Sequence, residues 1–144
     1  MPGGPKLKWV YDLYKASYPD LAAGVYYGDH QASAEELVTP YVLPQENGAR
    51  AGVRNALIGT SGGSLRLTVL PGHSEEVAVT VSPWSRKTMA ATAHHHELVA
   101  DGRTHVSVDL FQAGLGTAAC GEGVLPRYRL AARPGRVRLL LEAV

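Results

Sequence analysis

The sequence has little of several features that define common classes of protein. It contains one cysteine, so no internal disulfide can form, which fits a reducing compartment. Its formal net charge is only +1, which gives no electrostatic reason to expect binding to nucleic acid or an anionic membrane. No apolar run approaches the ~20 residues of a membrane-spanning helix, and the first ten residues lack the apolar core of a signal peptide. We therefore expect a soluble, cytoplasmic protein.

What the chain does contain indicates an all-β fold. It has 144 residues, the size of one domain, with sixteen glycines and nine prolines between short segments of alternating apolar and polar residues. A period of two is typical of half-buried strands, and strands at regular spacing favour an antiparallel β-sandwich. We predict strands in residues 8–14, 23–29, 51–59, 64–70, 76–82, 105–110, 126–130 and 136–144.

Two helix signals interrupt the alternation. Ser85 can act as a helix N-cap, and the alanine-rich run after it predicts one short helix near residues 85–93. Ser33 and Glu36 have the spacing of a capping box, which predicts a single helical turn. Glu35 and Glu36 are adjacent on this turn, so we interpret them as a solvated pair rather than catalytic carboxylates.

A proline-rich segment precedes a strong turn signal. Pro40 and Pro44 bracket residues 41–43 and predict an extended conformation there, since proline disfavours helix at the residue before it. Asn47-Gly48 is a dipeptide that tolerates left-handed dihedral angles. We predict a structural hairpin turn at this dipeptide, with Arg50 anchoring nearby acceptors.

Three consecutive histidines raise the question of a metal site. Zinc normally takes at least three protein ligands, and in an extended segment only His94 and His96 share a face. No cysteine pair or ordered carboxylate is close in sequence. We predict no metal site here, and a hydrogen-bonding role at the edge of a sheet instead. A metal-binding protein built on these histidines is the least favoured hypothesis, and it predicts metal-dependent melting.

The most distinctive stretch joins a clear strand to a glycine-rich loop. In HVSVDL, residues 105–110, Val106 and Val108 share one face with Leu110. The following AGLGTAACGEG packs four glycines and the only cysteine into eleven residues, so its backbone can take positive φ angles and approach other groups closely. PRYRL, residues 126–130, is predicted to return as a strand.

Three blocks of sequence resemble the C-terminal sandwich domain of glycoside hydrolase family 2 β-galactosidases. They are YPD at residues 18–20, TPYVLPQENGARAGVR at residues 39–54 and DLFQAGLGTAACGEGVLPRYRL at residues 109–130. They occur in the family's order and near its spacing. The resemblance covers residues 18–144 and implies a small-chain domain that is part of a galactose-mutarotase-like supersandwich. Residues 1–17 depart from the family's pattern, so we treat them as a divergent N-terminal segment.

The resemblance implies one position close to the substrate. In the family, the glycine-rich loop reaches the active site of a neighbouring barrel domain, and some members place a sugar-stacking tryptophan on it. Cys120 stands at or beside that position, and Gly121 is the counterpart if the loop is one residue shorter. Cysteine offers less stacking surface than tryptophan, so weaker aglycone binding is expected. The alternative is that Cys120 is simply a small buried hydrophobic residue.

The same resemblance implies that this chain does not catalyse alone. A retaining glycosidase needs two carboxyl groups ~5–5.5 Å apart, which the family carries on its barrel together with Mg and Na. This chain is too short for the ~250 residues of such a barrel. We therefore predict a part of a β-galactosidase with no catalytic residue and no cofactor of its own, whose partner is the large catalytic part or a second copy.

A competing hypothesis is a freestanding sandwich, structural or carbohydrate-binding, without hydrolase activity. Fold alone does not imply function. The family's terminal domain has additional strands before the matched region, so this chain is expected to expose unpaired strand edges. A well-behaved monomer would favour the freestanding sandwich, whereas a chain that associates would favour a missing partner.

Overall fold

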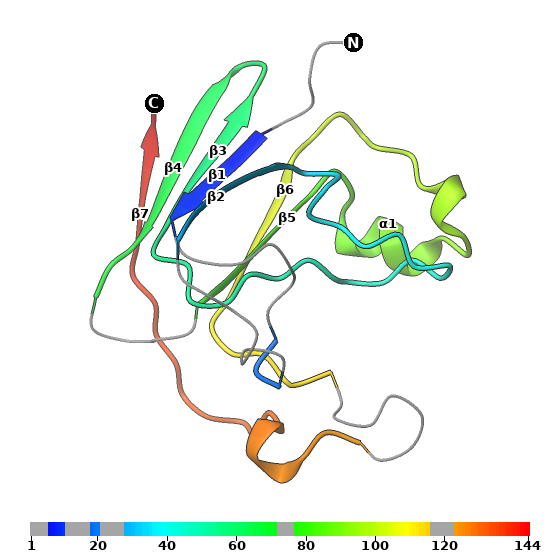
Figure 1. Cartoon of the computed structure of the whole chain (residues 1–144), viewed down its shortest axis with the longest axis vertical. Helices are drawn as coiled ribbons and strands as arrows, with labels where there is room; N and C mark the ends of the chain where they lie inside the picture. The colour runs from blue at the N-terminus through cyan, green and yellow to red at the C-terminus, as the bar shows by residue number, and fades with distance from the viewer. Residues whose placement is uncertain (1–5, 11–17, 21–27, 72–76, 116–122) are drawn as a thin grey trace.

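Seven strands form two antiparallel sheets in the computed structural model, which describes residues 6–10, 18–20, 28–71, 77–115 and 123–144 (Figure 1). The first sheet has five strands in the order β2-β1-β3-β4-β7, and the second pairs β5 with β6. The predicted all-β fold with one short helix is therefore confirmed. Within the part of the chain that the structure describes, every helix is too short or too polar to span a lipid bilayer.

The strands of the five-stranded sheet come from both ends of the chain. They are β1 (Lys6–Val10), β2 (Asp29–Ser33), β3 (Asn55–Thr60), β4 (Gly63–Val69) and β7 (Leu139–Ala143). β3 and β4 form a hairpin through the predicted glycine turn. β1 lies between β2 and β3 in this sheet although it precedes residue 18, where the resembling blocks begin. The boundary at residue 17 stays a prediction.

The second sheet carries the short helix on one side. It consists of β5 (Ala78–Ser82) and β6 (His105–Asp109), and the helix α1 (Arg86–Ala91) lies between them in sequence. The Ser85 side chain accepts a hydrogen bond from the Thr88 amide, so the predicted N-cap is confirmed. Two single 3₁₀ turns follow, η2 (His95–Glu97) and η3 (Pro126–Tyr128).

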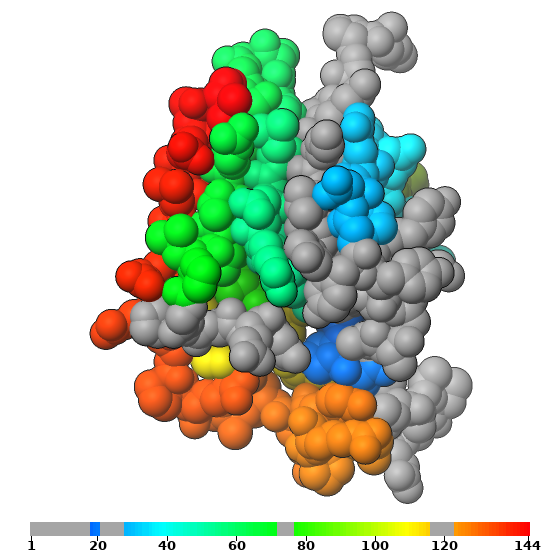
Figure 2. Space-filling view, turned by 60° about the vertical axis from the view of Figure 1, so that its left-hand side comes forward, coloured from blue at the N-terminus to red at the C-terminus, as the bar shows by residue number. Residues whose placement is uncertain are grey.

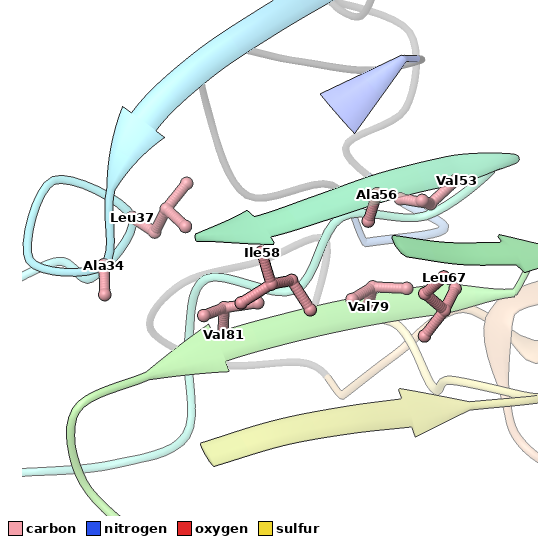
Figure 3. Close-up of a cluster of buried hydrophobic side chains, with 8 residues drawn as sticks. All are labelled: Ala34, Leu37, Val53, Ala56, Ile58, Leu67, Val79 and Val81. Atoms are coloured by element: carbon pink, nitrogen blue, oxygen red, sulfur yellow. The ribbon is translucent and has the colours of Figure 1, made fainter. Parts of the chain in front are cut away.

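The core lies between the two sheets. Apolar side chains of β3 and β4 point toward those of β5, as Figure 3 shows for Ile58, Leu67 and Val81. The predicted inward residues Val77, Val79 and Val81 are all buried. β5 is buried along its whole length because its second face is covered as well.

The last strand is only partly buried. Leu139 packs against the core, but Leu141, predicted to lie on the core face, is 57% exposed. Leu141 does share that face, because it pairs with the buried Leu67. Figure 2 shows β7 in red at the margin of the sheet beside β4 in green. The strand is exposed because no described segment of the second sheet lies opposite it.

Two strand predictions differ from the structure. PRYRL is wrong as a strand: Pro126 begins η3, in which the Tyr128 amide donates to the Leu125 carbonyl. Proline suits the first position of such a turn, where its missing N–H is not needed. The strand predicted in residues 23–29 lies almost wholly outside the described residues, and the observed β2 begins at Asp29. Its polar sequence, DHQAS, hides it from a search for apolar alternation.

The segment with the Asn47-Gly48 dipeptide is a closed loop rather than a hairpin. Gly48 has the expected positive φ of 81°, but no described strands flank the turn. The Asn47 side chain instead accepts from the Thr39 amide at 2.7 Å and donates to the carbonyls of Thr39 and Gln45. The buried Arg50 guanidinium donates to the carbonyls of Gly48 and Leu37. Its anchoring role is confirmed.

The capping box after β2 is also confirmed. The Ser33 amide donates to Glu36 Oε2 at 2.7 Å, and the Glu36 amide donates to Ser33 Oγ at 3.2 Å. This hydrogen bond from the Ser33 amide holds the pKa of Glu36 below its usual range. Glu35 and Glu36 are both exposed, and the carboxylate of Glu36 is occupied in capping.

The histidine run forms the turn η2 rather than an extended segment at a sheet edge. The rings of His94 and His96 meet edge to face with 5.5 Å between centroids, and His95 meets Trp84 in the same way. The His94 amide donates to Glu97 Oε2. Among the described residues, no three His, Cys, Asp or Glu side chains come together as a metal site.

Two glycines with the same backbone conformation give a matched stability test. Gly48 and Gly102 have φ of 81° and 78°, so alanine is strained at either position by about 1 kcal/mol. A Cβ on Gly48 would also lie 2.5 Å from the Leu37 carbonyl oxygen, whereas nothing lies within 4 Å at Gly102. We expect Gly48→Ala to lower the free energy of unfolding by about 3 kcal/mol and Gly102→Ala by about 1 kcal/mol. Urea denaturation measures both, and equal losses would contradict the closed loop.

Candidate functional site

The predicted substrate-contacting residues, Cys120 and Gly121, lie outside the described residues. The structure does describe both ends of their loop. The outgoing end, residues 110–115, follows β6. The returning end, residues 123–125, leads into η3. The site can therefore be built from the contacts that hold these two ends.

Asp20 holds the outgoing end of the loop. The Leu115 amide donates to Asp20 Oδ1 at 3.1 Å, and the Gly114 amide donates to the Tyr128 carbonyl at 3.0 Å. A hydrogen bond to a charged acceptor is stronger than one between neutral groups. Asp20 thus ties the N-terminal part of the chain to a backbone amide immediately before the loop.

A side chain at Gly114 would require the Asp20 side chain to move. A Cβ there would lie 2.6 Å from Asp20 Oδ2 and 3.0 Å from Val124 Cγ1. On the returning end, Arg129 Nε donates to the Val124 carbonyl at 3.0 Å. The two ends of the loop are therefore held side by side, with glycine needed for their close approach.

These contacts bring together two of the three blocks singled out in the sequence. YPD contributes Asp20, and the glycine-rich block contributes Gly114 and Leu115. Sequence reasoning noted the YPD tripeptide but gave Asp20 no role. The only sequence signal for Asp20 was that its block lies in the family's order and near the family's spacing. That signal does not identify the residue that Asp20 contacts.

A second feature is a polar pocket on the outer face of the β5-β6 sheet, away from the core. Its floor is formed by Thr80, Ser82, His105 and Ser107, which face the same way because Thr80 pairs with Ser107 and Ser82 with His105. The helix α1 and the closed loop at Glu46 form its walls. We call this feature the outer pocket. Its volume is about 270 Å³, which suits a small ligand.

Glu46 gives the outer pocket an unusual carboxylate. The residue remains exposed, but burial of its carboxyl end raises the pKa of Glu46. The charge of Arg86, and then interactions with the hydroxyls of Tyr18 and Thr80, lower that pKa in part. Burial, and then the nearby charge of Glu46, raises the pKa of Tyr18 to about 12. The Tyr18 hydroxyl therefore stays protonated at neutral pH.

One ion pair and one histidine–carboxylate hydrogen bond hold the walls in place. Arg86 on α1 contacts Asp109 on β6 at 2.7 Å, which fastens the helix to the outer face of the sheet. His105 Nε2 lies 3.2 Å from Asp101. The Arg103 amide, helped by His105, holds the pKa of Asp101 below its usual range. Sequence reasoning missed this pocket because its residues are ordinary polar side chains on four separate segments.

A third feature is an apolar groove at the open end of the sandwich. It lies between the β3-β4 hairpin, the end of β7 and β6, and it has a volume of about 560 Å³. Its apolar lining comes from Ile58, Leu65, Val106, Ala143 and Val144. We call it the open-edge groove. Val106 and Val144 are 37% and 61% exposed, so much of this inward-facing surface remains accessible to solvent.

The role of Asp20 can be tested on the isolated chain. We expect Asp20→Ala to speed hydrogen exchange of the Leu115 amide about fivefold or more, since a net hydrogen bond contributes ~1 kcal/mol. Asp20→Asn retains an acceptor oxygen and should have a smaller effect. Asp101→Ala is the control, because Asp101 accepts from the Arg103 amide on a different loop. Exchange at Leu115 that is unchanged in Asp20→Ala would refute this anchor.

Comparison with known proteins identifies the family of the chain. The chain matches the family described as "Beta galactosidase small chain" over residues 7–141. It is 34% identical to a β-galactosidase of Psychromonas ingrahamii over 69% of this chain and 9% of that protein. It is 32% identical to a β-galactosidase of Arthrobacter sp. over 88% of this chain and 12% of that protein. For a β-galactosidase of Aeromonas hydrophila the identity is 29%, over 92% and 12%.

The chain thus spans about a tenth of the length of these relatives. The match of the family to residues 7–141 covers all seven strands at least in part, as well as both described ends of the glycine-rich loop. The chain belongs to the β-galactosidase small-chain family.

Proposed function

We propose that this domain associates with the large catalytic part of a cytoplasmic β-galactosidase and completes it. In this proposal the assembled enzyme hydrolyses terminal β-D-galactosides. The small chain supports the barrel domain and brings the loop of residues 116–122 to its active site. The catalytic glutamates, together with the Mg and Na that the resemblance implies, belong to the large part.

The observation that carries this proposal is the open-edge groove. Five strands of one sheet face a second sheet that has two strands among the described residues, so β4 and β7 extend beyond their cover. Leu141 and Val144 remain exposed on or beside the inward face for this reason. Contiguous apolar surface of this kind is typical of an interface. β6 also has a free edge within the described region, which could pair with a further strand.

The loop supports the second part of the proposal. Asp20 and Tyr128 hold the outgoing end, and Arg129 holds the returning end, so both described ends of the loop are tied to the rest of the domain. A loop on a rigid base can supply a contact to a neighbouring site at little entropic cost. This arrangement suits a chain that contributes to an active site without holding the reacting groups.

Complementation tests the association. The purified chain is mixed with a large β-galactosidase chain truncated before the matching region, and hydrolysis of a chromogenic β-galactoside is measured. We expect activity only in the mixture. A cooperative, stable melt of the small chain with no gain of activity would instead favour a freestanding sandwich.

Two neighbouring leucines of β7 provide a matched pair for this assay. Leu141 faces the groove side, whereas Leu140 pairs with Thr68 on the opposite face, and both are exposed. Leu141→Lys should raise the concentration needed for half-maximal activity at least about tenfold, because a charge would be buried at the interface. Leu140→Lys should leave it nearly unchanged. Equal effects of the two substitutions would exclude this groove as the docking surface.

The loop is tested in the complemented enzyme. We expect Cys120→Trp or Gly121→Trp, whichever occupies the stacking position, to lower KM for an aryl galactoside about two- to tenfold, the gain expected from one aromatic contact. The value for galactosides with a small alkyl aglycone should change less. If neither variant distinguishes aryl from alkyl substrates, the loop does not reach the aglycone.

A further inference from the structure

The backbone of β6 carries hydrogen-bonding groups on the edge that faces away from β5. Val79 exchanges two backbone hydrogen bonds with Arg50, at 2.8 and 2.9 Å, on the far edge of β5. Because successive residues of a strand direct their backbone groups to alternate edges, the residue after Val79 bonds toward β6, where it pairs with Ser107. The N–H and C=O groups of Val106 and Val108 therefore point to the other edge of β6, where no described strand pairs with them.

The side chains next to this edge are apolar. Those of Val106 and Val108 face the larger sheet: Val108 packs against the core, and Val106 lines the open-edge groove. Beyond them the inward face of the larger sheet continues with Leu65 on β4 and Leu141 on β7, which are 36% and 57% exposed. The space beside β6 is thus bordered by open backbone groups and by an uncovered apolar surface.

This combination selects an extended segment as the occupant. A helix bonds its backbone groups internally, so it could cover the apolar surface but would leave the edge of β6 unpaired. An added strand pairs with that edge and directs every second side chain toward the apolar surface. The groove and the open edge are then satisfied by one element.

A second copy of this chain does not fit through its own β6. Two copies of β6 that pair antiparallel are related by a two-fold axis, which places the inward faces of both copies on the same side. In each copy the larger sheet continues past β6 on that side, as the exposure of Leu141 indicates. The larger sheets of the two copies would therefore occupy the same space, whereas a single strand has room.

We propose that the large part of the enzyme supplies one extended segment that adds to β6 as a third strand of the smaller sheet. Its backbone exchanges hydrogen bonds with Val106 and Val108. Its side chains opposite these two valines are apolar and point toward Leu65 and Leu141, and the residues between them are polar because they lie on the outer face beside Ser107. This inference rests on the proposed function, because it names the element of the large part that docks.

Hydrogen exchange read at single residues tests the added strand in the complemented enzyme. In the isolated chain the amides of Val106 and Val108 should exchange quickly, whereas those of Ser107 and Asp109, which face β5, should exchange slowly. On addition of the large chain, exchange at Val106 and Val108 should slow at least about tenfold, with little change at Ser107 and Asp109. Restored activity without this slowing would overturn the added strand and leave the association intact. Slowing that grows with the concentration of the small chain alone would assign the edge to a second copy, which also overturns the proposal.

A peptide probe tests the same edge without the large chain. The peptide acetyl-KTVTVTVE-amide alternates valine with threonine, and acetyl-KTTTVVVE-amide has the same composition without the alternation. We expect only the alternating peptide to slow exchange at Val106 and Val108 of the isolated chain, with saturation at about millimolar concentration. Equal action of both peptides, or no action of either, rules out the added strand, whether or not the large chain restores activity.

A pair of substitutions at Val106 separates the backbone from the side chain. Val106→Pro removes an N–H that β5 does not use, and proline is tolerated at such a position of an edge strand. Val106→Ala shortens the same side chain and keeps the N–H. We expect Val106→Pro to need at least about tenfold more small chain than Val106→Ala for half-maximal activity, because the added strand loses one partner at the interface. Equal requirements would count against the added strand. An unfolding temperature far lower in Val106→Pro than in Val106→Ala would show that the chain itself uses this N–H, and would likewise overturn the proposal.

Discussion

The burial of β5 on both faces is the constraint on which the rest of the structure depends. Its inward valines, Val79 and Val81, share one buried cluster with Ala56 and Ile58 of β3 and Leu67 of β4. Its outward Thr80 and Ser82 are buried as well, because α1 and the closed loop at Asn47 cover them. When both faces of a strand are buried, the N–H and C=O groups along both of its edges need hydrogen-bond partners. β6 pairs one edge, and Arg50 pairs with Val79 on the other.

The sequence allowed prediction of those elements whose signal is local. The alternation in β3, β4, β5 and β6 reflects one apolar face that packs in the core, and the cap at Ser85 acts within a single turn. β2 was not predicted because its residues are polar, and pairing with β1 stabilises it instead. PRYRL alternates like a strand, but Pro126 starts a 3₁₀ turn that no strand accompanies. Whether each segment forms a strand depends on whether another strand pairs with it, and a short window of sequence does not show that pairing.

The candidate sites were predictable to different degrees. Resemblance pointed to the glycine-rich loop, but only the structure supplied its anchor at Asp20, because that contact joins distant parts of the chain. The outer pocket gave no signal at all, since Thr80, Glu46 and Arg86 are individually common surface residues. They become a candidate site only because the fold brings them together in one pocket around the buried Thr80. The open-edge groove exists because the two described sheets have unequal numbers of strands. From the sequence, exposed strand edges were expected only because the resembling family has additional strands.

The pairing of β4 with β7 also has a consequence for the order in which the molecule forms. Leu65 pairs with Ala143, and Val69 with Leu139, so the two strands come from opposite halves of the chain. A contact between such distant residues forms slowly, because a long loop must close first. During synthesis the N-terminal part of a chain is available before the rest. One wall of the groove is therefore completed only after residue 139 has left the ribosome, and until then the edge of β4 is open to pairing with other chains.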